Sequence, residues 1–341
     1  MNNIPYYPYS QYNTPPGYVE ALLEKKELKK TANRLCWTLL AALLLMSAFG
    51  SYICPLFLRA VGYTGDYSAE GFNGYTPVLF YLASGMGYVV GMALPVLLYF
   101  IFRRIKIWKL LPFEKAGFLK TAACALFGLA VCMLANIPAN AVANIQKVFG
   151  FPGELPESPL TNDLPVLILY GITVAIIPPV VEELFFRGLV LQSLRKFGDG
   201  FAIVASSVLF GLFHGNFVQF VFAFIAGLVM ALVVVRTGSL WTSILIHFLN
   251  NGISYAVQVT GRFLGEEQAN QIYSVIVMVI LALGLLSILY LWIKDRRFFR
   301  GDRQNTYFRF SSKLSAFFAN PGGVAILFFF AVLSIYTLNN Y

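Results

Sequence analysis

The chain has 341 residues, of which 58% are hydrophobic, 16% are aromatic and only 12% are charged, and its formal net charge is +9. A soluble domain carries about 25% charged residues, so this composition, with a mean hydropathy of +0.69, excludes a soluble enzyme, a disordered chain, a secreted disulfide scaffold and a typical nucleic-acid-binding protein. The sequence therefore predicts an integral membrane protein whose partners do not include nucleic acid.

The first region of the chain, residues 1–34, is predicted to be a cytoplasmic tail. It is rich in tyrosine and proline at first and becomes basic from Lys25 to Arg34. It has no basic start followed by a short apolar core and a small-residue cleavage site, so we expect no removable signal peptide. The first apolar run follows directly and is expected to act as an uncleaved anchor.

Long apolar runs occupy most of the remaining chain, and a run of about 20 such residues crosses the bilayer as a helix. We expect the transmembrane core to extend over residues 35–293, with one more span inside residues 322–341. The expected spans lie near residues 35–58, 77–102, 121–143, 164–186, 201–216, 217–235, 239–258, 273–293 and 322–338. Since the fifth run is short and the last lies apart from the others, the predicted fold class is an all-α polytopic transmembrane helical bundle with eight or nine spans.

Charged residues in the loops alternate in sign along the chain. Basic loops contain Arg103, Arg104, Lys106 and Lys109, then Arg195 and Lys196, then Arg236, and then residues 294–303. The intervening loops contain Asp66 and Glu70, then Glu154, Glu157 and Asp163, and then Glu266 and Glu267. Because Lys and Arg collect on the cytoplasmic side, we expect a multi-pass cell-membrane protein with a cytoplasmic N-terminus, and an outside C-terminus if the last run crosses.

Residues 294–321 are basic and aromatic, and we expect them to form a cytoplasmic segment. Arginine and phenylalanine are interleaved from Arg296 to Lys313, a composition that favours attraction to anionic membrane lipid at the interface. The alternative is an ordinary solvated loop, and the sequence leaves both open.

Ionisable side chains inside the apolar runs are rare and lie in one part of the chain. They are Glu182, Glu183, Arg187, His214 and His247, and the two histidines are the only ones in the sequence. A charge at the membrane centre costs at least ~2.5 kcal/mol, so such residues usually face a cavity and mark a functional site.

Four polar side chains are expected at similar depth in the membrane. Counted along ideal helices from the nearest charged residue at the basic face, Glu182, His214, His247 and Asn251 lie about 20, 22, 16 and 22 Å deep. His247 and Asn251 are four residues apart and therefore share one face of a helix. We expect these side chains to meet in one buried pocket, and the alternative is a set of unrelated hydrogen bonds between helices.

Two further features shape the helix that carries Glu182. Glu183 and Arg187 have the i,i+4 spacing of an ion pair with the acid N-terminal, which favours a structural role for both. Pro178 and Pro179 lack backbone donors, so they should bend or break the helix and leave carbonyl groups free to face a wet cavity.

The four polar side chains suit hydrolysis by activated water. Glu182, with His214 beside it, can take a proton from water, while His247 and Asn251 can donate to the oxyanion of a tetrahedral intermediate. The alternative is a divalent metal such as Zn²⁺ held by Glu182, His214 and His247. The motif H-E-x-x-H is absent, and we prefer a site without a metal or other cofactor. A serine nucleophile has less support because no G-x-S-x-G motif is present.

Three segments together resemble one known family. Residues 182–188 (Glu-Glu-Leu-Phe-Phe-Arg-Gly) match an E-E-x-x-x-R motif, residues 210–214 match F-x-x-x-H, and residues 247–251 match H-x-x-x-N. In order, spacing and apolar setting, they resemble the CAAX protease and bacteriocin-processing (CPBP) family of intramembrane endopeptidases, also called the Abi or type II CAAX prenyl endopeptidase family. The resemblance covers residues 160–258, under a third of the chain.

The resemblance implies endoproteolysis of a membrane-bound or amphipathic peptide or protein tail. In that family the first glutamate and first histidine activate water, and these roles fall on Glu182 and His214. The second histidine and the asparagine stabilise the oxyanion, and these roles fall on His247 and Asn251. The other matching positions, which are expected to be structural, are Glu183, Arg187 and Phe210. The alternatives are a non-catalytic bacteriocin-immunity or scaffold protein and a proton-coupled transporter.

Overall fold

The computed structural model describes residues 17–63, 72, 74–153, 158–300 and 307–340. Within these ranges every regular element is a helix, apart from one isolated bridge between Phe113 and Ser239, so the predicted all-α fold class is confirmed. Parts of the predicted tail and charged loops lie outside the described residues, namely residues 1–16, Asp66, Glu70, Glu154, Glu157 and Arg303.

The helices follow the expected apolar runs but most are longer. Their bounds are α1 (Tyr18–Ala48), α2 (Cys54–Ala60), α3 (Pro77–Arg103), α4 (Ile107–Leu110), α5 (Phe118–Val148), α6 (Leu164–Gly171), α7 (Ile177–Glu183), α8 (Leu191–Leu194), α9 (Asp199–Phe213), α10 (Phe217–Thr237), α11 (Leu240–Leu264), α12 (Glu266–Lys294), α13 (Phe310–Phe318) and α14 (Pro321–Asn340). Short π-helical turns join α1 to α2 (Phe49–Ile53), α6 to α7 (Ile172–Ile176) and α7 to α8 (Leu184–Val190). The stretch from α6 to α8 is therefore one long helical segment.

Seven helical stretches among the described residues are long and apolar enough to cross a membrane, so the predicted count of eight or nine spans is slightly too high. The expected spans at residues 201–216 and 239–258, which correspond to α9 and α11, are not among the seven. α9 has 15 residues, about 22 Å of helix, and is shorter than the ~30 Å hydrocarbon layer. α11 has 25 residues, but His247, Asn250 and Asn251 make it more polar than an ordinary span. The two expected spans that are too short or too polar to count as membrane-crossing helices are therefore α9, which ends just before His214, and α11, which contains His247.

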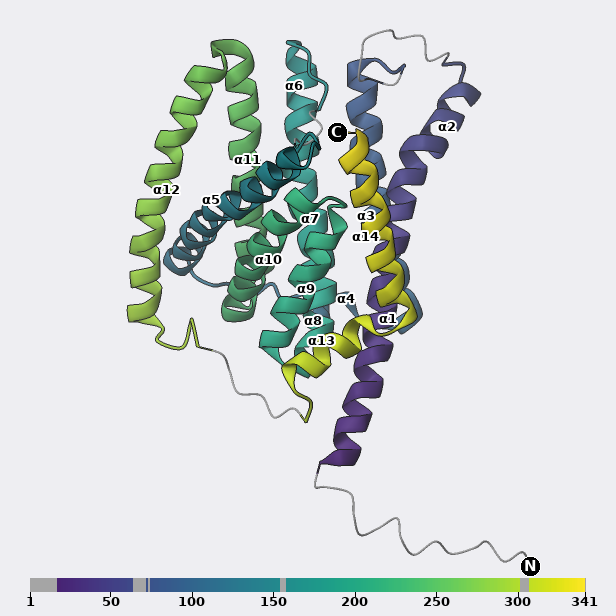
Figure 1. Ribbon diagram of the computed structural model, residues 1–341, viewed down its shortest axis with the longest axis vertical. Helices are drawn as coiled ribbons and strands as arrows, with labels where there is room; N and C mark the ends of the chain where they lie inside the picture. Colours follow the sequence, from purple (N-terminus) through teal and green to yellow (C-terminus); the bar gives the residue numbers. More distant parts are fainter. Residues whose placement is uncertain (1–16, 64–71, 73, 154–157, 301–306, 341) are drawn as a thin grey trace, which may run out of the picture.

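The helices form two groups on either side of the long segment α6–α8 (Figure 1). α1, α3 and α14 lie together on one side, where α1 packs against both of the others. α5, α11 and α12 lie on the other side, and the oblique α5 packs against α10 and α12. The segment α6–α8 contacts α3, α9 and α11. Side chains from both groups can therefore reach a site on this segment.

The basic ends of the helices meet at one end of the molecule. Arg236, at the end of α10, donates to the carbonyl of Phe298, which follows α12, and accepts from Lys120 near the start of α5. Lys196, at the end of the long segment, pairs with Glu27 of α1 at 2.9 Å. The sign alternation of the loops thus corresponds to a shared basic end in three dimensions, which we call the basic end.

α13 and the residues before it include side chains of the basic and aromatic segment that are buried. Lys313 is buried, donates from Nζ to the carbonyl of Phe197 at 2.5 Å and pairs with Glu24 at 3.0 Å. Phe298 and Phe317 are also fully buried. Lys313 and Phe298 are therefore enclosed by protein and do not face lipid. The attraction of its exposed arginines to anionic lipid stays a prediction.

Candidate active site

A proline pair reshapes the helix beside the site. Pro178 has no N–H to donate to the carbonyl of Val174, four residues earlier, and the π-helical turn Ile172–Ile176 lies just before it. The side-chain amide of Asn251 on α11 donates to this free carbonyl at 3.0 Å. The expected disturbance of the helix and its free carbonyl are both present, and the free carbonyl positions Asn251.

Glu182 of α7 is a buried carboxylate with one oxygen left without a donor. The side chain is 3% exposed. Its Oε1 accepts a hydrogen bond from the hydroxyl of Tyr88 on α3, whereas Oε2 has no hydrogen-bond partner among the described residues. The Nε2 atom of His247 is 4.0 Å from Oε2. An unsatisfied buried carboxylate oxygen is costly, so this atom marks a place for a water molecule or a substrate group.

The neighbouring Glu183 forms a buried network. Its Oε1 is 2.7 Å from Arg187 Nη1 and 3.0 Å from His247 Nδ1. The Arg187 guanidinium lies 4.2 Å from the ring centroid of Phe210 and also donates to the carbonyl of Gly227 at 3.4 Å. The expected i,i+4 pair is therefore formed, and Glu183 additionally orients a histidine, which the sequence spacing did not indicate.

Both histidines are held by one ring nitrogen and present the other to the site. His214, the residue after α9, has Nδ1 at 2.8 Å from the carbonyl of Phe210, which can only accept, so Nδ1 carries the hydrogen. His247 directs Nδ1 to the carboxylate of Glu183 in the same way. In each residue Nε2 is the atom left for chemistry. A turn at Gly215, with a φ of +70° that favours glycine, follows His214.

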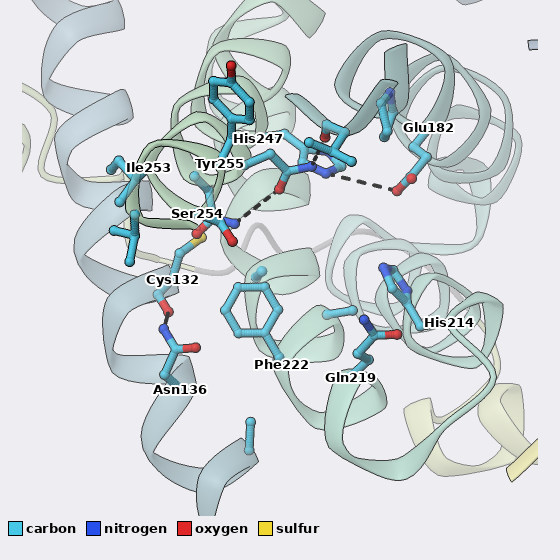
Figure 2. A pocket seen from close by; sticks show the side chains of 18 of the residues that line it. Cys132, Asn136, Glu182, His214, Gln219, Phe222, His247, Ile253, Ser254 and Tyr255 are labelled. Carbon is cyan, nitrogen blue, oxygen red and sulfur yellow. Dashed lines mark hydrogen bonds and ion pairs between the residues drawn. The ribbon is translucent and has the colours of Figure 1, made fainter. Parts of the chain in front are cut away.

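The four expected catalytic side chains line one cavity of about 660 Å³. Figure 2 shows Glu182 and His214 pointing toward one another across it, with His247 beside Glu182. Glu182, His214, His247 and Asn251 are all lining residues, whereas Glu183 and Arg187 lie behind them. The structure therefore brings together the set that the depth estimate grouped. Glu182 accepts from Tyr88 and its Oε2 lies 4.0 Å from His247 Nε2, so side chains other than His214 also surround the acid.

Several polar lining residues were not identified from the sequence. Tyr88, Cys132, Asn136, Gln219 and Gln258 all border the same cavity. Apart from Asn251, which shares a helix face with His247, the residues expected in the site are ionisable or aromatic, and the other carboxamide and hydroxyl groups were not predicted. A tyrosine hydroxyl or an amide at membrane depth needs a partner just as a charge does, and this signal would have found them.

The residues of the metal alternative are Glu182, His214 and His247. Across the part of the chain that the structure describes, no three His, Cys, Asp or Glu side chains gather closely enough to hold a metal ion. Glu182, His214 and His247 share the cavity, and each histidine is anchored through Nδ1, by Phe210 or Glu183, with Nε2 left for the cavity.

Comparisons with known proteins cover this same region. The family model described as "Type II CAAX prenyl endopeptidase Rce1-like" matches residues 164–253. Over 167 residues, 45% of this chain and 66% of the relative, the chain is 29% identical to "Membrane-embedded CAAX protease MroQ" of Staphylococcus aureus (strain USA300). Over 135 residues, 38% of this chain and 54% of the relative, it is 27% identical to "Putative membrane peptidase YdiL" of Bacillus subtilis (strain 168). No solved structure matches the chain.

The matches thus cover slightly under two thirds of one curated relative and about half of the other. The family match begins with α6 and ends inside α11, so it contains all three motifs and every expected catalytic residue. The predicted resemblance is confirmed: over residues 164–253 this polytopic membrane protein is similar to the type II CAAX prenyl endopeptidase family.

Proposed function

We propose that this protein is an intramembrane endopeptidase that uses Glu182 to activate water. The observation that carries the proposal is the Oε2 atom of Glu182, which is buried, has no hydrogen-bond donor and lies in a cavity with the Nε2 atoms of two anchored histidines. A carboxylate held in this way is suited to accept a proton from water. The peptidase names of the two relatives and the family match support the same reaction class.

The proposed reaction proceeds in two steps. Water bound between Glu182 Oε2 and His214 Nε2 loses a proton to Glu182 while its oxygen bonds to the peptide carbonyl carbon. The carbonyl oxygen becomes an oxyanion, which accepts hydrogen bonds from His247 and Asn251. Glu182 then returns the proton to the amide nitrogen as the C–N bond breaks, which releases a carboxylic acid and an amine.

The oxyanion role places definite demands on its donors. Nδ1–H of His247 is committed to Glu183, so a hydrogen bond from Nε2 to the oxyanion requires a hydrogen on both ring nitrogens. Asn251 gives one amide hydrogen to Val174 and keeps a second. The substrate is a membrane-bound or amphipathic peptide or protein tail, because the site lies within the helical bundle and not on a surface.

The test compares purified variants on a fluorogenic tail peptide. Glu182→Gln and His214→Ala should each lower the cleavage rate by at least ~100-fold, the usual contribution of general acid–base catalysis, while thermal unfolding stays unchanged. Glu267→Gln, an exposed site on α12, is the matched control and should cleave normally. Normal cleavage by both site variants rejects the proposal, and proton flux into liposomes without cleavage would point to a transporter.

A further inference from the structure

Along α11 and α12 the cavity extends from the catalytic groups toward one end of the molecule. On α11 its lining residues begin at His247 and continue through Asn251 to Gln258, away from the start of the helix at Leu240. On α12 it is lined by Tyr273, close to the first residue of that helix and far from Lys294. The cavity therefore runs toward the junction of α11 and α12, opposite the basic end.

The half of the bundle between Glu182 and the basic end is closely packed, whereas the other half, which contains the cavity, is called the open half. Along the long helical segment, the apolar side chains between Glu182 and Arg195 that have no exposed surface are Phe185, Phe186, Leu189, Val190, Leu191 and Leu194. Facing them on α11, Leu240, Ser243 and Ile246 are equally buried. Close packing of this kind admits neither water nor a chain. Access from the basic end is therefore blocked.

The walls of the open half carry amides and phenols instead of charges. Among the described lining residues, Glu182, His214 and His247 are the side chains of the Asp, Glu, His, Lys and Arg types. Asn136 uses its amide to donate to its own helix, which leaves its carbonyl oxygen for the cavity. Gln258 accepts from Tyr170 and keeps its amide hydrogens. One acceptor and one donor thus face the space, as the N–H and C=O groups of a peptide main chain require.

We infer that the cavity receives an uncharged, extended peptide segment that enters from the end opposite the basic loops. This inference rests on the proposed function and names the route and the substrate class. The volume of about 660 Å³ is within the ~300–1,000 Å³ of sites that enclose small ligands, so it holds a few residues around the scissile bond. With the basic end in the cytoplasm, the substrate comes from the outer side of the membrane.

The experiment uses sealed proteoliposomes that contain the full chain with an N-terminal tag. Vesicles with the tag outside are removed on a tag resin, which gives two populations of known orientation. The probe is a quenched peptide with an uncharged centre and lysines at both ends, so that it cannot cross the bilayer. Vesicles with the tag inside should cleave the added peptide at once, whereas vesicles with the tag outside should cleave it only after detergent is added.

Each outcome of this experiment has a separate meaning. Equal cleavage by both sealed populations, or cleavage only by vesicles with the tag outside, overturns the inferred route and leaves the proposed peptidase intact. No cleavage even in detergent rejects the proposed function and the inference together. Cleavage by sealed vesicles with the tag inside alone, and by both populations once detergent is added, supports both.

A charge placed in the wall tests the substrate class. Gln258→Glu should lower kcat/KM for the uncharged peptide by about tenfold, the scale of a poor pocket match. For a peptide with one lysine in its centre, the same variant should have a kcat/KM about tenfold higher than for the uncharged peptide. Gln268→Glu is the same chemical change at an exposed site on α12 and should alter neither value. If the unsubstituted enzyme cleaves peptides with charged centres as well as uncharged ones, the inferred substrate class is wrong.

Discussion

Tyr88 and Glu182 are 94 residues apart in the chain, yet the phenolic hydroxyl donates to the carboxylate inside the bundle. Tyr88 lies outside the family match and extends the site to α3. Its hydrogen bond fixes Oε1, so Oε2 is the oxygen that faces the histidines. We interpret Tyr88 as a positioning residue, because it acts through Glu182.

Tyr88→Phe keeps the ring and removes only the hydroxyl. We expect kcat to fall about tenfold with KM unchanged, since a hydrogen bond worth ~1.4 kcal/mol would no longer orient the carboxylate. Steady-state kinetics on the fluorogenic peptide measure both constants. Tyr99→Phe, on the same helix and away from the cavity, is the control. An equal loss in both variants, or a loss confined to KM, would contradict the positioning role.

At the scale of the element, the long segment α6–α8 positions site residues through a local break in its helical hydrogen bonding. Two prolines and two π-helical turns interrupt its regular hydrogen bonding, and π-helical turns are frequent at functional sites. Here the break leaves the Val174 carbonyl without a partner in its own helix, and the side-chain amide of Asn251 on α11 donates to it. The same segment aligns Glu183 with His247. One irregular helix therefore orients two side chains of the site.

Pro178→Ala should restore a regular helical hydrogen bond in this segment and lower the cleavage rate. The new N–H can bond to Val174, which removes the acceptor of Asn251, so we expect cleavage to fall about tenfold or more through misplacement of a catalytic group. Thermal unfolding should occur at the same or a higher temperature, because proline is the poorest residue inside a helix. Pro95→Ala in α3, outside the cavity lining, should leave cleavage unchanged. Unaltered cleavage by Pro178→Ala would show that the amide of Asn251 needs no such anchor.

At the scale of the whole molecule, the two termini of the described chain lie at opposite ends. α1 begins at the basic end, where Lys196 pairs with Glu27. α14 starts beside α1, where Gly322 donates to Asn33, and runs to the other end, near the top in Figure 1. On the way Ser334 donates to the carbonyl of Gly215, next to His214. The last helix thus covers the turn that holds one histidine.

This arrangement predicts where each terminus lies in the cell. A reporter fused before Met1 should be active in the cytoplasm, and one fused after Tyr341 should be active outside, since Lys and Arg favour the cytoplasmic side. The measurement is the activity of paired reporters that function on one side only. Two termini on the same side would show that the apolar run at residues 322–338 does not cross the membrane, and would contradict the predicted orientation of α14.

The sequence by itself determined the membrane class, the approximate position of the helices and the group of Glu182, His214, His247 and Asn251. These follow from apolar run length and from the high cost of polar groups in lipid, both of which act locally along the chain. Only the tertiary structure decided that Tyr88 and Glu183 orient this group, that Lys313 is buried and that residues of α5, α10 and α12 line the same cavity. Those features depend on which helices pack together, and contacts between residues far apart in sequence leave no periodic signal in either segment.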